Sequence, residues 1–168
     1  MRAIRAQVRV AGDEGALMRL QGYAAVFNSY SQDLGGFRER ILPGAFKKSL
    51  SGGADVRCLM NHDPNFVLGR TRSNTLRVQE DSIGLRFEVL LPNTQQARDL
   101  YETVKRGDMD QCSFAFTVDA DGDEWSEDQD ERGNRFIART LRAVNVFDVS
   151  AVTFPAYTDT TVGIGDVS

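Results

Sequence analysis

Polar and apolar residues alternate with a period of two along most of the chain, the pattern of a strand with one buried face. This pattern predicts nine short strands and no long helix between them. Such an order is typical of a mainly β fold, an antiparallel barrel or sandwich with a few helices (α+β). The predicted strands are residues 3–10, 17–27, 37–42, 56–62, 74–79, 83–90, 111–118, 135–144 and 146–153.

Two segments break the alternation and predict helices. In residues 93–106 the apolar positions fall at i, i+3, i+4 and i+7: Ala97, Leu100, Tyr101 and Val104. Asn93 is a suitable N-cap, and Gly107 stands where a left-handed C-cap belongs. Residues 43–50 predict a second, short helix. No linker or internal repeat divides the chain, so we expect one domain over residues 1–168.

Composition narrows the functional classes. The 168 residues are 41% hydrophobic and 26% charged, as in ordinary globular proteins. The net charge of −4 disfavours binding of nucleic acid by bulk electrostatics. No apolar run approaches the ~20 residues of a membrane helix, and we expect neither a secretory signal nor a membrane partner.

Cysteine and histidine are scarce. Cys58 and Cys112 are far apart in sequence and are expected to be reduced and buried. One histidine and two cysteines cannot supply the four ligands of a structural zinc site, and we expect no metal and no cofactor. Any chemistry that needs an imidazole must therefore use His62.

The segment 119–131 is strongly acidic, with eight carboxylates and Trp125. A calcium loop of the EF-hand type needs glycine at its sixth position, whereas Gly122 is fourth from Asp119, and no helices flank the segment. We therefore predict a solvated hairpin tip between two strands.

Three residues stand out on the predicted strands. On the predicted strand 56–62, His62 shares one face with the apolar residues Val56, Cys58 and Met60. It is therefore either a buried histidine that is hydrogen-bonded to a backbone carbonyl or a catalytic residue. Asp148 would share a row with Val144, Val146, Ser150 and Val152, and such a carboxylate either faces solvent or needs a buried donor. Ser113 shares one strand face with the small residues Ala115 and Thr117. These residues leave room for a substrate to approach the hydroxyl, but Ser113 could equally be an ordinary residue of a polar face.

Together His62, Ser113 and Asp148 offer the parts that acyl transfer needs. The hydroxyl is the nucleophile, the imidazole takes its proton, and the carboxylate orients the imidazole. Asp63 is the alternative third member, although a neighbour on a strand points to the opposite face.

Several stretches, in this order and spacing, resemble the prohead protease family of tailed bacteriophages. The likeness extends over roughly residues 15–160. The stretches that carry it are 22–28, 41–46, 61–63, 67–71, 81–85, 107–109, 113–116, 147–150 and 155–157.

The resemblance implies a serine endopeptidase whose fold is a β-barrel ringed by helices, as in the herpesvirus assemblins. Such enzymes act inside the immature capsid (prohead), in the host bacterial cytoplasm. They cleave the scaffolding protein or the scaffold segment of the major capsid protein, and then themselves. The motifs place His62 on the family's catalytic histidine and Ser113 on its nucleophile.

The third member and the oxyanion donors follow less directly from the resemblance. Many relatives have Glu at the position of Asp148, and assemblins use a second histidine that this chain does not have. The assemblin oxyanion loop corresponds to residues 153–157, where Pro155 has no N–H and Phe154 or Ala156 would donate. Because assemblins pair through a helix, residues 93–106 are the candidate surface for a homo-oligomer.

Two other functional classes remain open at this point. One is a catalytically inactive capsid-assembly or scaffold-binding module on the same barrel, against which the presence of both His62 and Ser113 argues. The other is an unrelated barrel that binds a small ligand or oligonucleotide, which the acidic charge disfavours.

Overall fold

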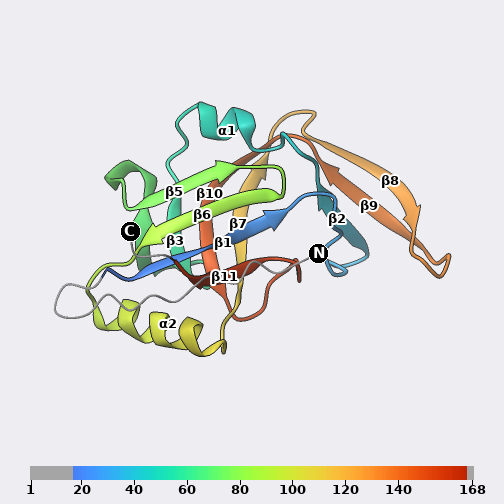
Figure 1. The fold of residues 1–168 in the computed structure, drawn as a ribbon. Helices are drawn as coiled ribbons and strands as arrows, with labels where there is room; N and C mark the ends of the chain where they lie inside the picture. Colours follow the sequence, from blue (N-terminus) through green and yellow to red (C-terminus); the bar gives the residue numbers. More distant parts are fainter. Residues whose placement is uncertain (1–16, 166–168) are drawn as a thin grey trace.

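The chain folds into a mainly β structure with two α-helices, seen in a computed structural model that describes residues 17–165 (Figure 1). The helices are α1 (Lys47–Ser51) and α2 (Gln95–Arg106), and a short 3₁₀ turn, η1, spans Thr71–Ser73. The strands are β1 (Arg19–Val26), β2 (Phe37–Ile41), β3 (Arg57–Met60), β4 (Asp63–Arg70), β5 (Leu76–Glu80), β6 (Gly84–Leu90), β7 (Gln111–Val118), β8 (Asp123–Gln129), β9 (Arg135–Leu141), β10 (Val144–Val152) and β11 (Thr161–Ile164).

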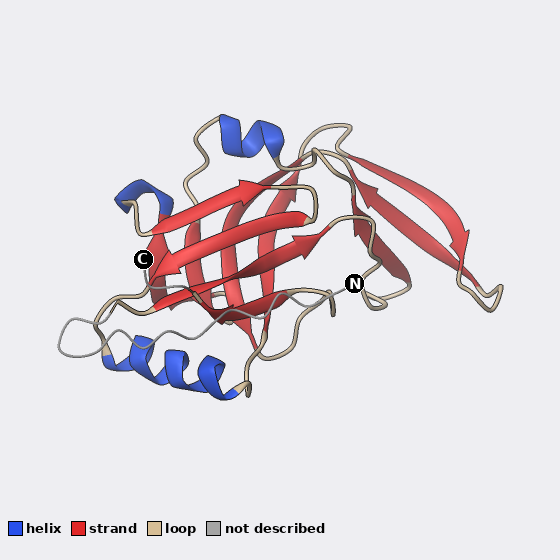
Figure 2. Cartoon of the chain, in the orientation of Figure 1, coloured by secondary structure: helices blue, strands red, loops and turns tan. Residues whose placement is uncertain are grey.

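Within residues 17–165 the strands form three hydrogen-bonded sheets, with orders β11-β1-β6-β5, β4-β3-β10-β7 and β2-β9-β8. The predicted single closed barrel is therefore not what these residues form. Nor is the pairing wholly antiparallel, because β3 pairs with β10 and β2 with β9 in parallel. In Figure 2 the first sheet lies across the second, and β8 and β9 extend to one side as an arm.

The core lies between the first two sheets. Phe46, which is fully buried just before α1, stacks on Phe27 and meets Phe114 edge to face. From the second sheet, Cys58, Val149 and Phe114 point into this core. The opposite face of that sheet, which we call the outer face, is therefore the one available for polar side chains.

The longer of the two helices, α2, is the element that the sequence predicts best. α2 buries Ala97, Leu100 and Val104, and Gly107 closes it in the left-handed region with φ of 86°. The N-cap is Thr94, whose Oγ1 accepts from the Ala97 N–H, and not the predicted Asn93. The predicted helix over 43–50 is reduced to α1, which begins at Lys47.

Three strands have no counterpart in the prediction: β4, β8 and β11. Pro64 is the second residue of β4, an edge strand. Proline is tolerated there because an edge strand leaves one row of N–H groups unpaired. The predicted strand over residues 3–10 lies outside the described residues.

The prediction that the acidic segment is a solvated hairpin tip is wrong for most of its length. Asp123–Gln129 form β8, which pairs with β9 along its full length. Trp125 packs on Phe37 of β2 and lies under Arg139 of β9. The tip itself is Asp130–Asn134, where the Asp130 carboxylate accepts from two backbone N–H groups.

Both cysteines are buried and free, as predicted. Burial raises the pKa of the Cys58 and Cys112 thiols well above its ordinary value. Across the described part of the chain, no helix is long and apolar enough to cross a bilayer.

Candidate active site

A β-bulge in β10 determines where Asp148 points. Val146 pairs with Phe116 on β7, but Asp148 pairs with the very next residue, Ala115, so that Phe147 is extra. Since successive residues of β7 face opposite sides, Val146 points into the core and Asp148 to the outer face. The predicted row that joined Asp148 to Val144 and Val146 is therefore wrong at this point.

After the bulge, successive residues of β10 again point to opposite faces of the sheet, and two serine hydroxyls lie on the same face as the Asp148 carboxylate. Ser150 lies two residues after Asp148 and shares its face. Across the strand gap, Ser150 is paired directly with Ser113 of β7. The outer face of the sheet thus carries Asp148, Ser150 and Ser113 side by side.

His62 reaches this face from a turn and not from the strand row predicted for it. β3 ends at Met60, and both Asn61 and His62 have positive φ, 52° and 56°. The side chain of His62 is 36% exposed and is no core residue. Its Nδ1 lies 2.6 Å from Asp148 Oδ1, and its backbone N–H donates to Ser150 Oγ at 3.2 Å.

Asp148 is well satisfied despite its burial. Its side chain is 9% exposed, and Oδ1 faces both His62 Nδ1 and the Ser150 hydroxyl, which donates at 3.0 Å. Because an ionised carboxylate only accepts, the contact requires a proton on Nδ1, and in the neutral ring Nε2 is then the acceptor. The alternative partner, Asp63, is the first residue of β4; its carboxylate accepts from the Asn65 N–H and has no hydrogen bond to the ring.

Ser113 is partly exposed in the middle of the site, and Ser150 is fully buried. Among the described residues, no side chain or backbone group hydrogen-bonds to the Ser113 hydroxyl. The structure therefore joins His62 to Asp148 by direct contact and sets Ser113 on the neighbouring strand of the same face, without a hydrogen bond to the ring.

The loop after β10 borders the site and is held at both ends. The Thr153 N–H donates to Asn61 Oδ1 at 2.9 Å, so this loop is tied to the turn that carries His62. At the far end, Tyr157 Oη donates to the buried Glu39 at 2.6 Å. Between them Phe154 is 91% exposed, and among the described residues neither its N–H nor that of Ala156 has a hydrogen-bond partner.

Glu39 is one of the few buried acidic residues. Desolvation raises the pKa of its carboxyl, although the Tyr157 hydroxyl and Arg139 oppose this effect. Burial and the same carboxylate raise the pKa of Tyr157 far above its ordinary value. The hydrogen bond from the Tyr157 phenol to Glu39 therefore anchors the loop to β2.

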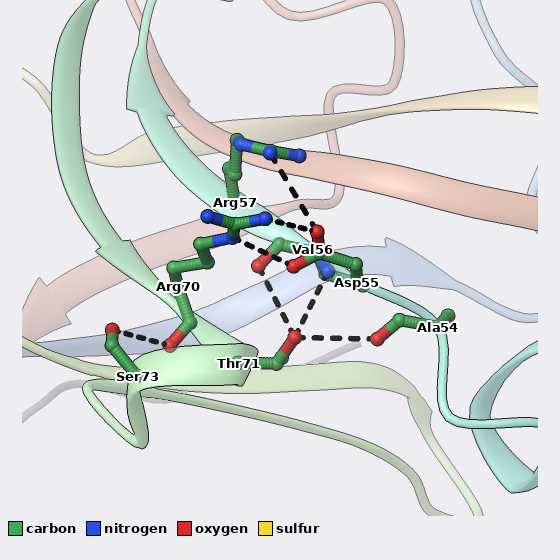
Figure 3. Close-up of polar contacts among 7 residues, drawn as sticks. All are labelled: Ala54, Asp55, Val56, Arg57, Arg70, Thr71 and Ser73. Carbon is green, nitrogen blue, oxygen red and sulfur yellow. Dashed lines mark hydrogen bonds and ion pairs between the residues drawn. The ribbon is translucent and has the colours of Figure 1, made fainter.

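A polar network fixes the beginning of β3, the strand that leads to His62 (Figure 3). Arg70 of β4 forms a two-pronged ion pair with Asp55, with Nε–Oδ1 at 2.8 Å and Nη2–Oδ2 at 2.5 Å, and Arg57 lies 3.6 Å from the same carboxylate. Thr71 Oγ1 accepts from the Val56 N–H. The bonds from Arg70 hold the pKa of Asp55 at about 2.

Sequence reasoning missed Ser150 and Asn61. A signal for Ser150 existed, because a serine two residues from an unpaired acid on the same strand shares its face. The role of Asn61 depends on a left-handed turn, which the strand pattern over 56–62 concealed.

Comparison with solved structures defines the class of fold. The chain is similar to the protease of varicella-zoster virus, with a TM-score of 0.52 and 12% sequence identity. The similarity covers 90% of this chain but 65% of the viral one, so the chain spans about two thirds of that protease's length. It thus has an assemblin-like fold. None of the curated proteins compared with the chain matches it.

The family follows from the sequence. The model of the caudovirus prohead serine proteases matches residues 5–167. The chain belongs to this family. The resemblance that its motifs indicate is confirmed.

Proposed function

We propose that the chain is a serine endopeptidase of capsid maturation, with Ser113 as nucleophile, His62 as general base and Asp148 as the carboxylate that orients the ring. One observation carries the proposal: the 2.6 Å contact between His62 Nδ1 and Asp148 Oδ1 on the sheet face that also bears Ser113. This contact leaves the Nε2 lone pair free to take a proton from a nearby hydroxyl.

In the proposed reaction, Ser113 Oγ attacks the carbonyl carbon of the scissile peptide bond while its proton passes to His62 Nε2. The negative charge on the carbonyl oxygen needs N–H donors, each of which typically contributes about 3–4 kcal/mol. Phe154 and Ala156 are the proposed donors. Thr153 cannot serve because Asn61 occupies its N–H, and Pro155 has none.

His62 then gives its proton to the leaving amine, and the acyl group stays on Ser113. A water that His62 deprotonates attacks this ester, and the new carboxyl end departs as the proton returns to Ser113. Through both steps Asp148 stabilises the imidazolium.

The proposed substrates are the scaffolding protein, or the scaffold segment of the major capsid protein, and the protease itself. The proposed place of action is the interior of the prohead in the host bacterial cytoplasm. Family membership supports these assignments. The partial exposure of Ser113 is compatible with the approach of a peptide substrate.

Active-site labelling tests the nucleophile. A fluorophosphonate probe followed by peptide mapping is expected to modify Ser113, and Ser113→Ala and His62→Ala are expected to abolish the label. Ser126→Ala, which alters a strand serine on the arm, is the matched control and should label like the parent protein. A label on another residue, or full labelling of Ser113→Ala, contradicts the assignment.

Cleavage tests the substrate. The chain is mixed with the scaffolding and major capsid proteins of its own phage, and the fragments are mapped by mass spectrometry. We expect fragments from the parent protein and none from Ser113→Ala. Equal fragmentation by both would assign the cleavage to another protease.

A further inference from the structure

Ser150 lies beneath the His62–Asp148 pair and contacts both of its members. Its side chain is fully buried, at 0% exposure. The hydroxyl donates to Asp148 Oδ1 at 3.0 Å and accepts from the backbone N–H of His62 at 3.2 Å. A serine hydroxyl has one hydrogen to donate, and here both of its functions are directed at the same pair.

The two hydrogen bonds of Ser150 act on the backbone of His62 and on the carboxylate of Asp148. His62 is in a turn with φ of 56°. This conformation costs a non-glycine residue free energy, which contacts with the surrounding structure must offset. The N–H bond to Ser150 fixes this backbone against β10. At the other end, the hydroxyl contacts the same oxygen, Oδ1, that faces the ring, and so it fixes the rotation of the carboxylate.

The bulge at Phe147 is what allows this arrangement. It turns Asp148 and Ser150 together to the outer face, in register with Ser113. Because Ser150 has no exposed surface, a substrate cannot touch it, and its cross-strand neighbour Ser113 is the hydroxyl that a substrate can reach. The two serines therefore have different tasks.

We propose that Ser150 is a positioning residue that holds the imidazole and the carboxylate in the orientation that catalysis requires. It acts through His62 and Asp148 and makes no bond to the substrate. The catalytic part of this inference rests on the proposed function, whereas the positioning part concerns the geometry alone.

Ser150→Ala removes both bonds, and Ser49→Ala is its matched control. Ser49 of α1 is also buried, and its hydroxyl accepts a backbone N–H of the same strand β10, that of Val146, at 3.2 Å. Both variants thus lose a hydroxyl that satisfies a backbone N–H. Only the first loses a bond to the His62–Asp148 pair.

The kinetic readout is the labelling of Ser113 by the fluorophosphonate at increasing probe concentration. For Ser150→Ala we expect the maximal rate to fall about 10- to 100-fold, the range that a hydrogen bond to a charged group spans, with the half-saturating concentration unchanged. Ser49→Ala is expected to stay within about twofold of the parent. Equal rates for the two variants would overturn the proposal.

The spectroscopic readout does not need activity. His62 is the only histidine, so its ring N–H proton gives an unambiguous low-field NMR signal when Asp148 holds it. We expect this signal in the parent protein and in Ser49→Ala, and its loss or a large upfield shift in Ser150→Ala. An unchanged signal in folded Ser150→Ala refutes the positioning role.

One measurement needs no variant and covers the case in which Ser150→Ala does not fold. The backbone N–H of His62, although in an exposed turn, should exchange slowly with solvent in the parent protein because it donates to Ser150. Rapid exchange of this amide would refute the proposed anchor. A parent protein that keeps the NMR signature but never reacts with the probe would instead refute the proposed function.

Discussion

Asp148→Asn is the substitution that most directly examines the proposed relay, because it keeps the shape of the side chain and removes its charge. The carboxylate meets the imidazole at 2.6 Å, so the two charge centres are about 4 Å apart when the ring is protonated. At an effective dielectric constant near 20, a pair at this distance interacts by about 4 kcal/mol, which corresponds to about 10³ in rate. Screening at the part-exposed ring lowers this value, and inversion of the ring tautomer raises it, so we expect a loss of about 10²–10⁴.

The assay is the second-order rate of fluorophosphonate labelling at Ser113, measured beside the thermal melting of each protein. The melting curve checks that each variant is folded, because removal of one member of a buried, hydrogen-bonded pair can itself destabilise a protein. Asp63→Asn is the control and should label within about threefold of the parent. If Asp148→Asn retains more than a tenth of the parent rate, or if Asp63→Asn loses more, the assignment of the third residue is wrong.

Three further predictions concern stability and reactivity. Phe46→Ala should lower the free energy of unfolding by about 3–5 kcal/mol in urea titrations, because it empties a fully buried site between aromatic rings. Asp55→Asn should lower the urea midpoint at pH 5, and the difference should shrink towards pH 2. Its carboxylate has its folded pKa depressed to about 2 by Arg70, so this contribution is present above the unfolded value near 3.9 and is lost as the pH falls through the folded one. Cys58 and Cys112 should resist iodoacetamide at pH 8 in the native protein and react after unfolding, because burial raises their thiol pKa.

The elements that the sequence predicted well are those whose own side chains decide their form. α2 buries one apolar stripe and ends at a glycine, and both signals are local. β7 begins and ends at the predicted residues because its apolar and polar positions alternate without interruption. The three candidate site residues were selected on similarly local signals. His62 is the only imidazole, Ser113 is a hydroxyl flanked by small residues, and Asp148 is an acid among valines.

The errors have a different origin. β8 is an edge strand, and its acidic sequence shows no alternation of apolar residues that would predict a strand. Its backbone pairing with β9 holds it in place, as do ion pairs from arginines such as Arg139 to Asp123. The bulge at Phe147 depends on how β10 pairs with a strand far away in sequence. A period-two pattern cannot reveal such a shift, which is why Asp148 was assigned to the row of Val144 and Val146, although the same pattern did place Ser150 on the face of Asp148.

Because Phe147 is an extra residue in β10, we expect the strand to tolerate its deletion. Phe147 is 45% exposed, so its deletion would empty no core space. A shortened β10 would simply become regular, with Val146 still inward and Asp148 still outward, because the bulge already treats them as neighbours. Homologous enzymes with one residue fewer at this position would therefore keep the acid pointing in the same direction, and gaps in alignments here need not signal a change of chemistry.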